Sequence, residues 1–588
     1  MALCAIAMLL SIVSVWRAWI SPTRIAFLNY QATELGLISK ANESGMIKLS
    51  EITTDDFDDL DDYDMIFVNG MGLRIDEAQR QQLKDAAEKV PVLTRAATNP
   101  DNNISSVKGF DAEYITKYVS NGGKKNYRNM LQYVRKFIDG KKFMAPEPDV
   151  VEEHPDYLLA HYDPEDEDGD SKGFNSVAEY NQFLKENGLY KEDAPVVLIT
   201  GFMGSADELE KPFEEKGFVV YRVNQLKAFV AKHHADSVNV SAVVNMAHGR
   251  LGDYFVKFIS EKNIPLFSPL NVNKLTEEWE NDKQGMFGGF MSQSIVTPEI
   301  DGAIRPYVVF AHRINDEGLQ EVYGIPDRVE SFVENIQNYV DLKKKANSEK
   351  KVAIFYLKGL GQNALVASGM EVVPSLYNLL VHLKKEGFNV AGLPSSETEL
   401  AKMIQSQGAV FGTYAEGAYT NFLANGNPVL VTSDQYAEWT SKALSKSQIE
   451  EMNLVNGAFP GKYLSTEDGR LAVARLQFGN IVLMPQVMAG EGDDSFKIVH
   501  GTNQAPPHVY IASYLWAKYG FGADALIHFG THGSLEYTPR KQVALCDNDW
   551  SDRLVGTMPH FYVYTIGNVG EGMIAKRRTY ALSLSDFG

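Results

Sequence analysis

Short apolar runs with the character of β-strands recur along this 588-residue chain, and amphipathic helical patterns separate many of them. Alternation of strands and helices is typical of parallel sheets, in which a helix crosses back over one face after each strand. A chain of this length also exceeds what one hydrophobic core supports. We therefore expect an α/β protein with several parallel-sheet βαβ domains in tandem. The predicted strands are residues 24–29, 64–69, 90–94, 196–200, 218–222, 238–244, 264–267, 352–357 and 388–392.

Two polar stretches divide these strands into groups. Residues 163–170 carry six acids in eight positions but lack the spacing of a calcium-binding loop, which indicates a solvated linker. A lysine-rich stretch at 343–351 indicates a hinge. The predicted boundaries are a membrane anchor at 1–20, an α/β domain at 21–145, an acidic linker at 146–190, a second α/β domain at 191–345 and a final region at 346–588.

The anchor is predicted because residues 2–16 contain no charged side chain and the run ends in the bulky Trp-Arg-Ala-Trp-Ile of residues 16–20. A cleaved secretory signal would end in small residues, so we predict an uncleaved single anchor that spans the membrane only if residues 1–20 all take part. The alternative is a buried first helix. Arg17 and Arg24 favour a cytoplasmic body, but Met1 could be an internal start, so the side of the membrane stays open.

The composition narrows the class of partner. A formal net charge of −20 argues against nucleic acid, because phosphates require a basic face. With two cysteines the chain can form at most one disulfide, which could not hold together a protein of this size. No glycine-rich phosphate loop with its lysine and hydroxyl residue is present, so we expect that this chain binds no nucleotide.

The richest local pattern lies near the end of the chain, where His528, His532 and Glu536 are spaced by four and four around a glycine-rich corner. Two imidazoles and a carboxylate are suitable metal ligands if they converge on one side of a helix or across a tight turn. The alternative is that they only bond the backbone of that corner. The basic run at 576–578 has two similar interpretations, carboxylate binding by arginine or a solvated helix face.

The run from Gly522 to Val543 resembles the signature of the cobaltochelatase large subunit and magnesium chelatase H subunit family. Further matching motifs are Phe478-Gly-Asn480, Gln486, Pro507-His508, Met558-Pro-His560, Gly570-Glu-Gly572 and Ala575-Lys-Arg-Arg578. The resemblance implies a protein that binds a tetrapyrrole and moves a divalent metal into or out of it. It also implies separate AAA+ ATPase subunits as partners if the metal is inserted.

The sequence departs from the family pattern in three ways. Arg540 stands where insertion enzymes usually have glycine, the N-terminal anchor is foreign to soluble subunits, and the chain stops at Gly588, well before family members end. We therefore expect a fragment or truncated product. Membrane-attached relatives in gut anaerobes resemble haem-handling proteins that extract iron. The prediction is a haem dechelatase at the inner membrane, facing the periplasm if it serves haem uptake.

The resemblance also implies roles for individual residues. His528, His532 and Glu536 are the predicted catalytic and metal-binding residues, with the imidazoles facing the metal and the carboxylate orienting them or shuttling protons. The predicted substrate-binding residues are His500, His508, Arg540, Lys541, Arg577 and Arg578. Two alternatives stay open: a cobaltochelatase subunit that inserts cobalt during cobalamin synthesis, and a non-catalytic haem carrier. The metal would be iron, or else cobalt or magnesium.

Overall fold

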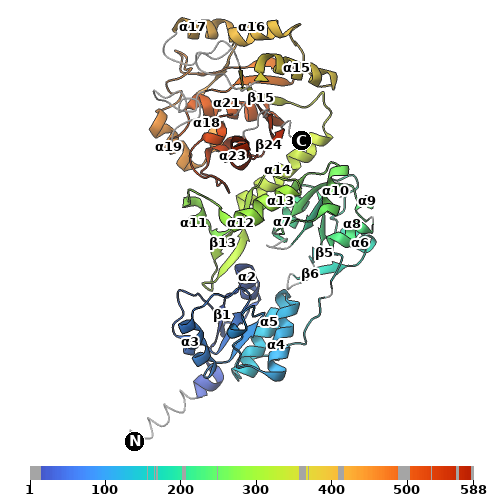
Figure 1. Ribbon diagram of the computed structural model, residues 1–588, viewed down its shortest axis with the longest axis vertical. Coiled ribbons are helices and arrows are strands. Elements are labelled where there is room, and N and C mark those ends of the chain that lie inside the picture. Colours follow the sequence, from blue (N-terminus) through green and yellow to red (C-terminus); the bar gives the residue numbers. More distant parts are fainter. Residues whose placement is uncertain are drawn as a thin grey trace.

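The computed structural model is elongated, with three α/β units stacked along its long axis in chain order (Figure 1). It describes residues 15–154, 156–164, 166, 170–201, 207–232, 234–247, 249–356, 366–367, 370–407, 416–487, 504–530, 533–563 and 569–584. Three sheets of four, seven and six strands carry the three units. The prediction of several parallel-sheet domains in tandem is confirmed.

The N-terminal unit is a parallel four-stranded sheet in the order β2-β1-β3-β4. Its two central strands, β1 and β3, are buried at nearly every position, as expected where helices cover both faces of a parallel sheet. The strands are β1 (Thr23–Leu28), β2 (Ile47–Ile52), β3 (Met65–Asn69) and β4 (Val92–Arg95); the helices are α2 (Ala32–Ala41), α3 (Glu77–Ala87), α4 (Gly109–Asn121) and α5 (Gly123–Tyr133). Within this unit, β2 is the strand that the sequence patterns did not predict.

The second unit is a seven-stranded sheet in the order β12-β10-β9-β7-β8-β5-β6. All five residues of β7 (Val196–Thr200) and of β8 (Val219–Val223) are buried. The remaining elements are β5 (Leu159–Tyr162), β6 (Ser171–Phe174), β9 (Val240–Asn245), β10 (Leu266–Phe267), β12 (Ala303–Ile304), α6 (Val177–Glu186), α7 (Asp207–Glu215), α8 (Leu226–Ala231), α9 (His234–Ser237) and α10 (Asp253–Glu261).

The structure differs here from the linker predicted at 146–190. The strands β5 and β6 form an antiparallel hairpin that extends the second sheet through β8, and α6 buries Tyr180, Phe183 and Leu184 against it. The acidic residues lie between the two hairpin strands. The acidic pattern of this stretch did not reveal the short strands on either side of it.

A smaller sheet, β11-β13-β14, links the first two units. The hairpin of β13 (Val308–Ile314) and β14 (Gln320–Gly324) points toward α2 of the N-terminal unit (Figure 1). At that contact Asn42 donates to Glu317 Oε1 over 2.7 Å. The associated elements are β11 (Leu270–Leu275), α11 (Thr276–Asn281), α12 (Gly288–Met291), α13 (Thr297–Ile300) and the long α14 (Pro326–Lys344), which leads into the third unit.

The third unit is a six-stranded sheet in the order β20-β21-β15-β22-β23-β24. From β21 onward every pair is parallel, and β20 pairs antiparallel with β21. The strands are β15 (Val352–Tyr356), β20 (Leu476–Phe478), β21 (Ile481–Pro485), β22 (Ala525–Phe529), β23 (His560–Val563) and β24 (Leu582–Leu584).

Helices pack on this sheet and two short ladders flank it. They are α15 (Val372–Lys385), α16 (Glu397–Gln407), α17 (Glu416–Asn425), α18 (Ser433–Ala443), α19 (Lys446–Asn456), α21 (His508–Leu515), α22 (Trp550–Val555) and α23 (Val569–Thr579), with the pairs β16 (Val366–Ala367) and β17 (Met370–Glu371), and β18 (Val429–Val431) and β19 (Leu471–Val473). The strand predicted at 388–392 is wrong. Both edges of β15 are already paired, with β21 and β22, so Val390 only packs into the core.

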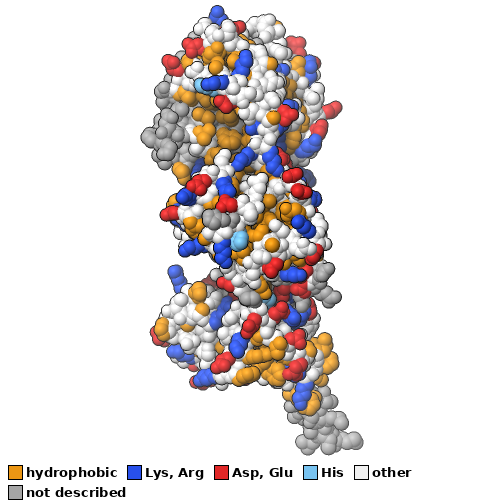
Figure 2. All heavy atoms as spheres, turned by 90° about the vertical axis from the view of Figure 1, so that its right-hand side faces the viewer, with side chains coloured by type: hydrophobic (Ala, Val, Ile, Leu, Met, Phe, Trp, Pro, Cys, Tyr) orange, Lys and Arg blue, Asp and Glu red, His pale blue; other side chains and the backbone are white. Residues whose placement is uncertain are grey.

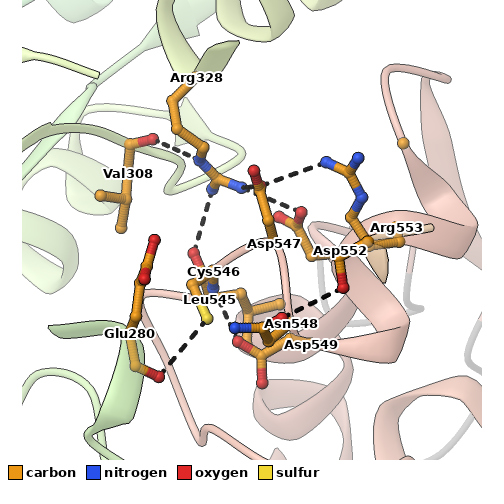
Figure 3. A network of polar contacts seen from close by, with 12 residues as sticks. Glu280, Val308, Arg328, Leu545, Cys546, Asp547, Asn548, Asp549, Asp552 and Arg553 are labelled. Atoms are coloured by element: carbon orange, nitrogen blue, oxygen red, sulfur yellow. Dashed lines mark hydrogen bonds and ion pairs between the residues drawn. The ribbon is translucent and has the colours of Figure 1, made fainter. Parts of the chain in front are cut away.

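A buried polar network joins the second and third units (Figure 3). The guanidinium of Arg328 on α14 donates to Asp552 over 3.0 Å, to Asp547 over 2.8 Å, and to the carbonyl oxygens of Val308 and Leu545. The backbones approach so closely that a Cβ at Gly285 would lie 1.8 Å from the carbonyl oxygen of Val543. The second and third units therefore share a closely packed junction with a buried ion-pair network.

The charged side chains are dispersed over the surface. On the face shown in Figure 2, lysines and arginines lie among aspartates and glutamates along the whole molecule. Among the described residues, no helix is both long and apolar enough to cross a bilayer. Residues 1–14 of the predicted anchor lie outside the described part, and Trp16–Ile20 form one helical turn in which both tryptophans are about half exposed.

Candidate functional site

The carboxyl ends of β21, β15 and β22 lie side by side at one edge of the third sheet. The chain passes from β15 to β21 on one side, then crosses through α21 to β22 on the other side. In open α/β sheets, ligands bind at the carboxyl edge where the direction of winding changes in this way. The predicted site residue His528 lies on β22 at this edge.

His528 is buried, and both of its ring nitrogens are engaged. Nε2 lies 2.9 Å from the hydroxyl of Tyr514 on α21, and Nδ1 lies 2.9 Å from Nε2 of His560 on β23. The other nitrogen of His560 lies 2.8 Å from the carbonyl oxygen of Thr579. The hydroxyl of Tyr514 also lies 2.8 Å from Oε1 of Gln486, the first residue after β21. Five separate segments of the sheet and its helices therefore share one hydrogen-bonded chain.

Burial keeps these groups uncharged at neutral pH. It lowers the pKa of His560 to about 4, and it lowers the pKa of His528 well below its usual value, with the neighbouring His560 adding to the effect. Burial also raises the pKa of the Tyr514 hydroxyl. The network is thus a set of neutral donors and acceptors.

The third member of the predicted triad, Glu536, lies in a short 3-10 turn (Leu535–Tyr537) and has no exposed surface. Its Oε1 accepts from the backbone N–H of Gly533 over 3.0 Å and from the hydroxyl of Tyr562 over 2.8 Å. A Cβ at Gly533 would lie 3.0 Å from Glu536 Oε2 and 3.4 Å from Cδ2 of His528. The carboxylate and the imidazole therefore flank the same glycine, across a turn rather than along a helix.

Comparison with known proteins gives the family of this chain. A sequence model of the family described as CobN/Magnesium Chelatase matches residues 116–585. The chain belongs to this family. The match spans the second and third units and part of the first, including every described residue of the network.

Individual relatives carry the same names. The chain is 33% identical over 318 residues to the chloroplastic magnesium-chelatase subunit ChlH of rice, which covers 53% of this chain and 22% of the relative. It is 28% identical over 316 residues to the aerobic cobaltochelatase subunit CobN of Pseudomonas aeruginosa, covering 52% and 24%. An uncharacterised protein of Methanocaldococcus jannaschii is 26% identical over 533 residues, covering 84% and 42%.

A solved structure has the same fold. The catalytic subunit of cobaltochelatase from Mycobacterium tuberculosis superimposes with a TM-score of 0.68 and 20% identity, covering 96% of this chain and 47% of that chain. This CobN/magnesium chelatase family member thus spans less than half the length of each of these four proteins.

Two of the predicted site histidines, His500 and His532, lie outside the described residues. Within the described part of the chain, no group of three or more histidine, cysteine, aspartate or glutamate side chains is placed to hold a metal ion. The predicted metal ligation by His528, His532 and Glu536 therefore stays a prediction.

His508 is buried at the start of α21, away from the His528 chain along that helix. Its Nε2 lies 2.9 Å from the carbonyl oxygen of Gly457, and its Nδ1 lies 3.1 Å from the hydroxyl of Tyr436. Burial lowers its pKa. These contacts hold α21 against the neighbouring helices, and the substrate-binding role predicted for His508 stays untested.

The predicted basic residues divide into two groups. Arg577 forms a two-pronged contact with Glu299 of the second unit, and Lys541 donates to the carbonyl oxygen of Glu280 over 2.8 Å, so both support the junction between units. Arg578 is buried, and it donates to the carbonyl oxygen of Thr538. Burial lowers the pKa of Arg578 while Asp549 and Glu536 oppose that effect, which places this cation beside the Glu536 turn.

Arg540 pairs with Glu451 near the surface and has a backbone φ of 99°, a conformation that glycine adopts far more readily. The glycine that the family pattern usually has at this position therefore suits the backbone.

We predict that Arg540→Gly is more stable than Arg540→Ala by about 1 kcal/mol. Both variants lose the ion pair, so their difference isolates the strain that a Cβ causes at this φ. Chemical unfolding followed by intrinsic fluorescence measures the difference. Equal stability, or a more stable alanine variant, would show that the φ carries no cost.

Sequence reasoning missed four members of the network: Gln486, Tyr514, His560 and Tyr562. Gln486 and His560 do occur in motifs shared with the family, and that was the available signal. Local spacing could not reveal them, because parallel pairing of β22 with β23 brings His560 beside His528 across 32 positions.

A groove of about 1080 Å³ lies elsewhere, beside α7 and α14 in the second unit. Six acids and three lysines contribute to its lining, and no member of the His528 network does. Because this polar groove is remote from the carboxyl edge of the third sheet, we base the candidate site on the network.

Proposed function

We propose that this protein binds a tetrapyrrole at the carboxyl edge of the third sheet and transfers a divalent metal between the macrocycle and solution. Membership of the family supports the class of substrate. The observation that carries the location is the buried Glu536, bonded to Tyr562 and facing the His528 ring across Gly533. Because the chain spans less than half of its relatives, the activity of a whole relative is part of this proposal.

The chemistry requires groups that handle two protons. A metal ion that enters the ring displaces two pyrrole N–H protons, and a metal ion that leaves must be replaced by two protons. A carboxylate held beside neutral hydrogen-bonding partners can take up or release a proton with little rearrangement. We assign that role to Glu536, with Tyr562 holding the carboxylate in place. His528 and His560 form the neutral wall behind it.

The finer proposal is removal of iron from haem, which is supported by arginine at position 540, the apolar N-terminal segment and the resemblance to haem-handling relatives. Insertion of cobalt with the help of AAA+ ATPase subunits is equally consistent with the family relationship. The third possibility is haem carriage without turnover. Membrane attachment through residues 1–20 is also a proposal, which partition of the expressed chain between membrane and soluble fractions tests.

One experiment separates the three functions. We expect that anaerobic incubation of the protein with haem and a reductant produces the fluorescence of metal-free porphyrin. A haem absorption band that persists on the protein without fluorescence would instead indicate carriage. Cobalt insertion would be indicated by two results together. The protein would fail to bind haem, and the absorption of the metal-free macrocycle would be lost when Co²⁺, ATP and ATPase subunits are supplied. Absence of any spectral change with either tetrapyrrole would contradict the whole proposal.

A further inference from the structure

A small apolar surface lies on the N-terminal unit, at the end of the molecule that carries the N-terminus (Figure 1). Trp16 and Trp19 of the helical turn Trp16–Ile20 form it together with Phe143 and Met144, and each of these four side chains is about half exposed. No residue of that turn is buried. On the face shown in Figure 2, hydrophobic side chains gather at this end of the molecule. We call these four residues the aromatic surface; a contiguous exposed apolar patch of this kind indicates contact with a partner.

Hydrogen bonds hold the two segments of the aromatic surface together. The backbone N–H groups of Lys142 and Phe143 donate to the carbonyl oxygen of Trp19 over 3.1 and 3.0 Å. The guanidinium of Arg135 is fully buried, and it donates to the carbonyl oxygens of Ser21 over 3.1 Å and of Phe143 over 2.6 Å. A buried cation is stable only when such acceptors surround it, so it fixes the backbone on both sides. The aromatic surface is therefore part of the folded unit.

Positive charge is concentrated in the same two segments. Residues 15–24 and 134–144 carry six lysines and arginines and a single acid, Asp139. That acid is turned inward: it accepts from the hydroxyl of Thr23 over 2.6 Å and pairs with Lys141 over 3.2 Å. In a chain with a formal net charge of −20, these segments form a local excess of positive charge.

One of these cations lies directly against the aromatic surface. The Nζ of Lys142 lies 4.4 Å from the centre of the Trp19 ring. Acids of neighbouring segments are engaged in ion pairs with other cations; these pairs are Asp62 and Asp64 with Arg24, and Glu147 with Lys136. The aromatic surface therefore presents indole and phenyl rings together with a basic side chain.

This combination fits the interface between a lipid bilayer and water. Tryptophan rings favour the level of the lipid headgroups, and lysine and arginine extend beside them toward anionic phosphates. The chain itself also favours lipid over a folded protein partner, because residues 2–14, which precede the aromatic surface directly, contain no charged side chain. An apolar segment and an aromatic, basic surface that follow one another can enter the same bilayer.

We propose that the aromatic surface rests on an anionic lipid bilayer, with its rings at the headgroup level and with Arg17 and Lys142 against lipid phosphates. The inference rests on the membrane attachment proposed above, and it adds a contact that the folded N-terminal unit makes itself. The third unit lies at the opposite end of the molecule (Figure 1). The contact therefore holds the Glu536 edge away from the lipid.

The test places an environment-sensitive fluorophore on the full chain. In a Cys4→Ser background, Phe143→Cys provides a single reactive thiol, because Cys546 is buried. We expect vesicles of phosphatidylcholine and phosphatidylglycerol to shift the emission of this label to shorter wavelength and to lower its quenching by iodide several-fold. Leu454→Cys is the matched control, an exposed apolar position on α19 of the third unit, where the label should not respond.

A pair of charge reversals tests the basic part of the aromatic surface. Lys142→Glu, added to the chain labelled at position 143, should reduce the emission shift on vesicles that contain phosphatidylglycerol. Lys402→Glu makes the same change at an exposed position on α16 of the third unit and should leave the shift in place. Equal shifts in the two variants overturn the assignment of Lys142 to lipid phosphate.

Sedimentation of the vesicles separates the possible failures. A chain that sediments with the vesicles while the label at 143 stays open to iodide is attached through another segment, which overturns this inference and leaves the membrane attachment standing. A chain that does not sediment contradicts both. A label that is already shielded without vesicles shows that residues 1–14 or a second copy cover the aromatic surface, which also overturns the inference. Metal transfer is measured separately and decides none of these outcomes.

Discussion

Glu536→Gln is expected to lower metal transfer at least about 100-fold, because positioned proton transfer typically contributes about 10²–10⁴ to a rate. The amide keeps the shape of the carboxylate and can still accept from Gly533 and Tyr562 through its oxygen. It can no longer take up a proton. Tetrapyrrole affinity, measured by absorption titration, should change little.

The matched control for this variant is Glu438→Gln. Glu438 is exposed on α18 and pairs with Lys442, four residues along the same helix. It should transfer metal at the wild-type rate, since an exposed pair of this kind contributes less than about 1 kcal/mol. Wild-type turnover in Glu536→Gln would show that the carboxylate handles no proton in the reaction.

The largest effect on stability is expected for Arg328→Met. Removing one partner of a buried ion pair typically costs about 3–5 kcal/mol, because the other charge remains buried without compensation. Arg328 has two carboxylate partners and joins two units, so the loss should appear as a lower midpoint of thermal unfolding (Figure 3). Burial already raises the pKa of Asp552, so this residue should become protonated more readily in the variant.

Two comparisons make the Arg328 result interpretable. Arg24→Met removes an arginine whose ion pairs, at 3.9 Å, are partly exposed, and it should shift the midpoint little. Adding Asp552→Asn to Arg328→Met should recover part of the loss by removing the stranded charge. A midpoint that is unchanged in Arg328→Met would mean that the network contributes nothing to the junction between units.

The sequence predicted strands well where both faces of a strand are buried, because the apolar residues then form an unbroken run. The strands at 196–200 and 352–356 were predicted within a residue, because strands buried on both faces read as uninterrupted apolar runs. It was insufficient at 388–392, where the run packs in the core but forms no strand, and the backbone N–H of Asn480 donates to the carbonyl oxygen of Asn389. Whether such a run becomes a strand depends on which strands are free to pair. The two edges of β15 are already paired with β21 and β22, which lie far away in sequence.

For the site as well, the sequence was informative about residues that lie close together along the chain. Spacing singled out His528 and Glu536, and the structure places both side chains beside Gly533. Spacing could not reveal that the two ring nitrogens of His528 contact Tyr514 and His560, because sheet register and helix packing bring those partners close. Spacing also could not reveal that Arg577 contacts Glu299 of another unit, since a run of basic residues does not indicate which residues it contacts in the folded protein.

The central claim is that the carboxyl edge around Glu536 exchanges metal with a tetrapyrrole. The most direct measurement is porphyrin fluorescence during anaerobic incubation with haem and reductant, recorded in parallel for the wild-type chain, Glu536→Gln and Glu438→Gln. We predict that fluorescence appears with the wild-type protein and with Glu438→Gln, and that Glu536→Gln binds haem but remains dark. Equal rates of fluorescence increase in all three would contradict the claim.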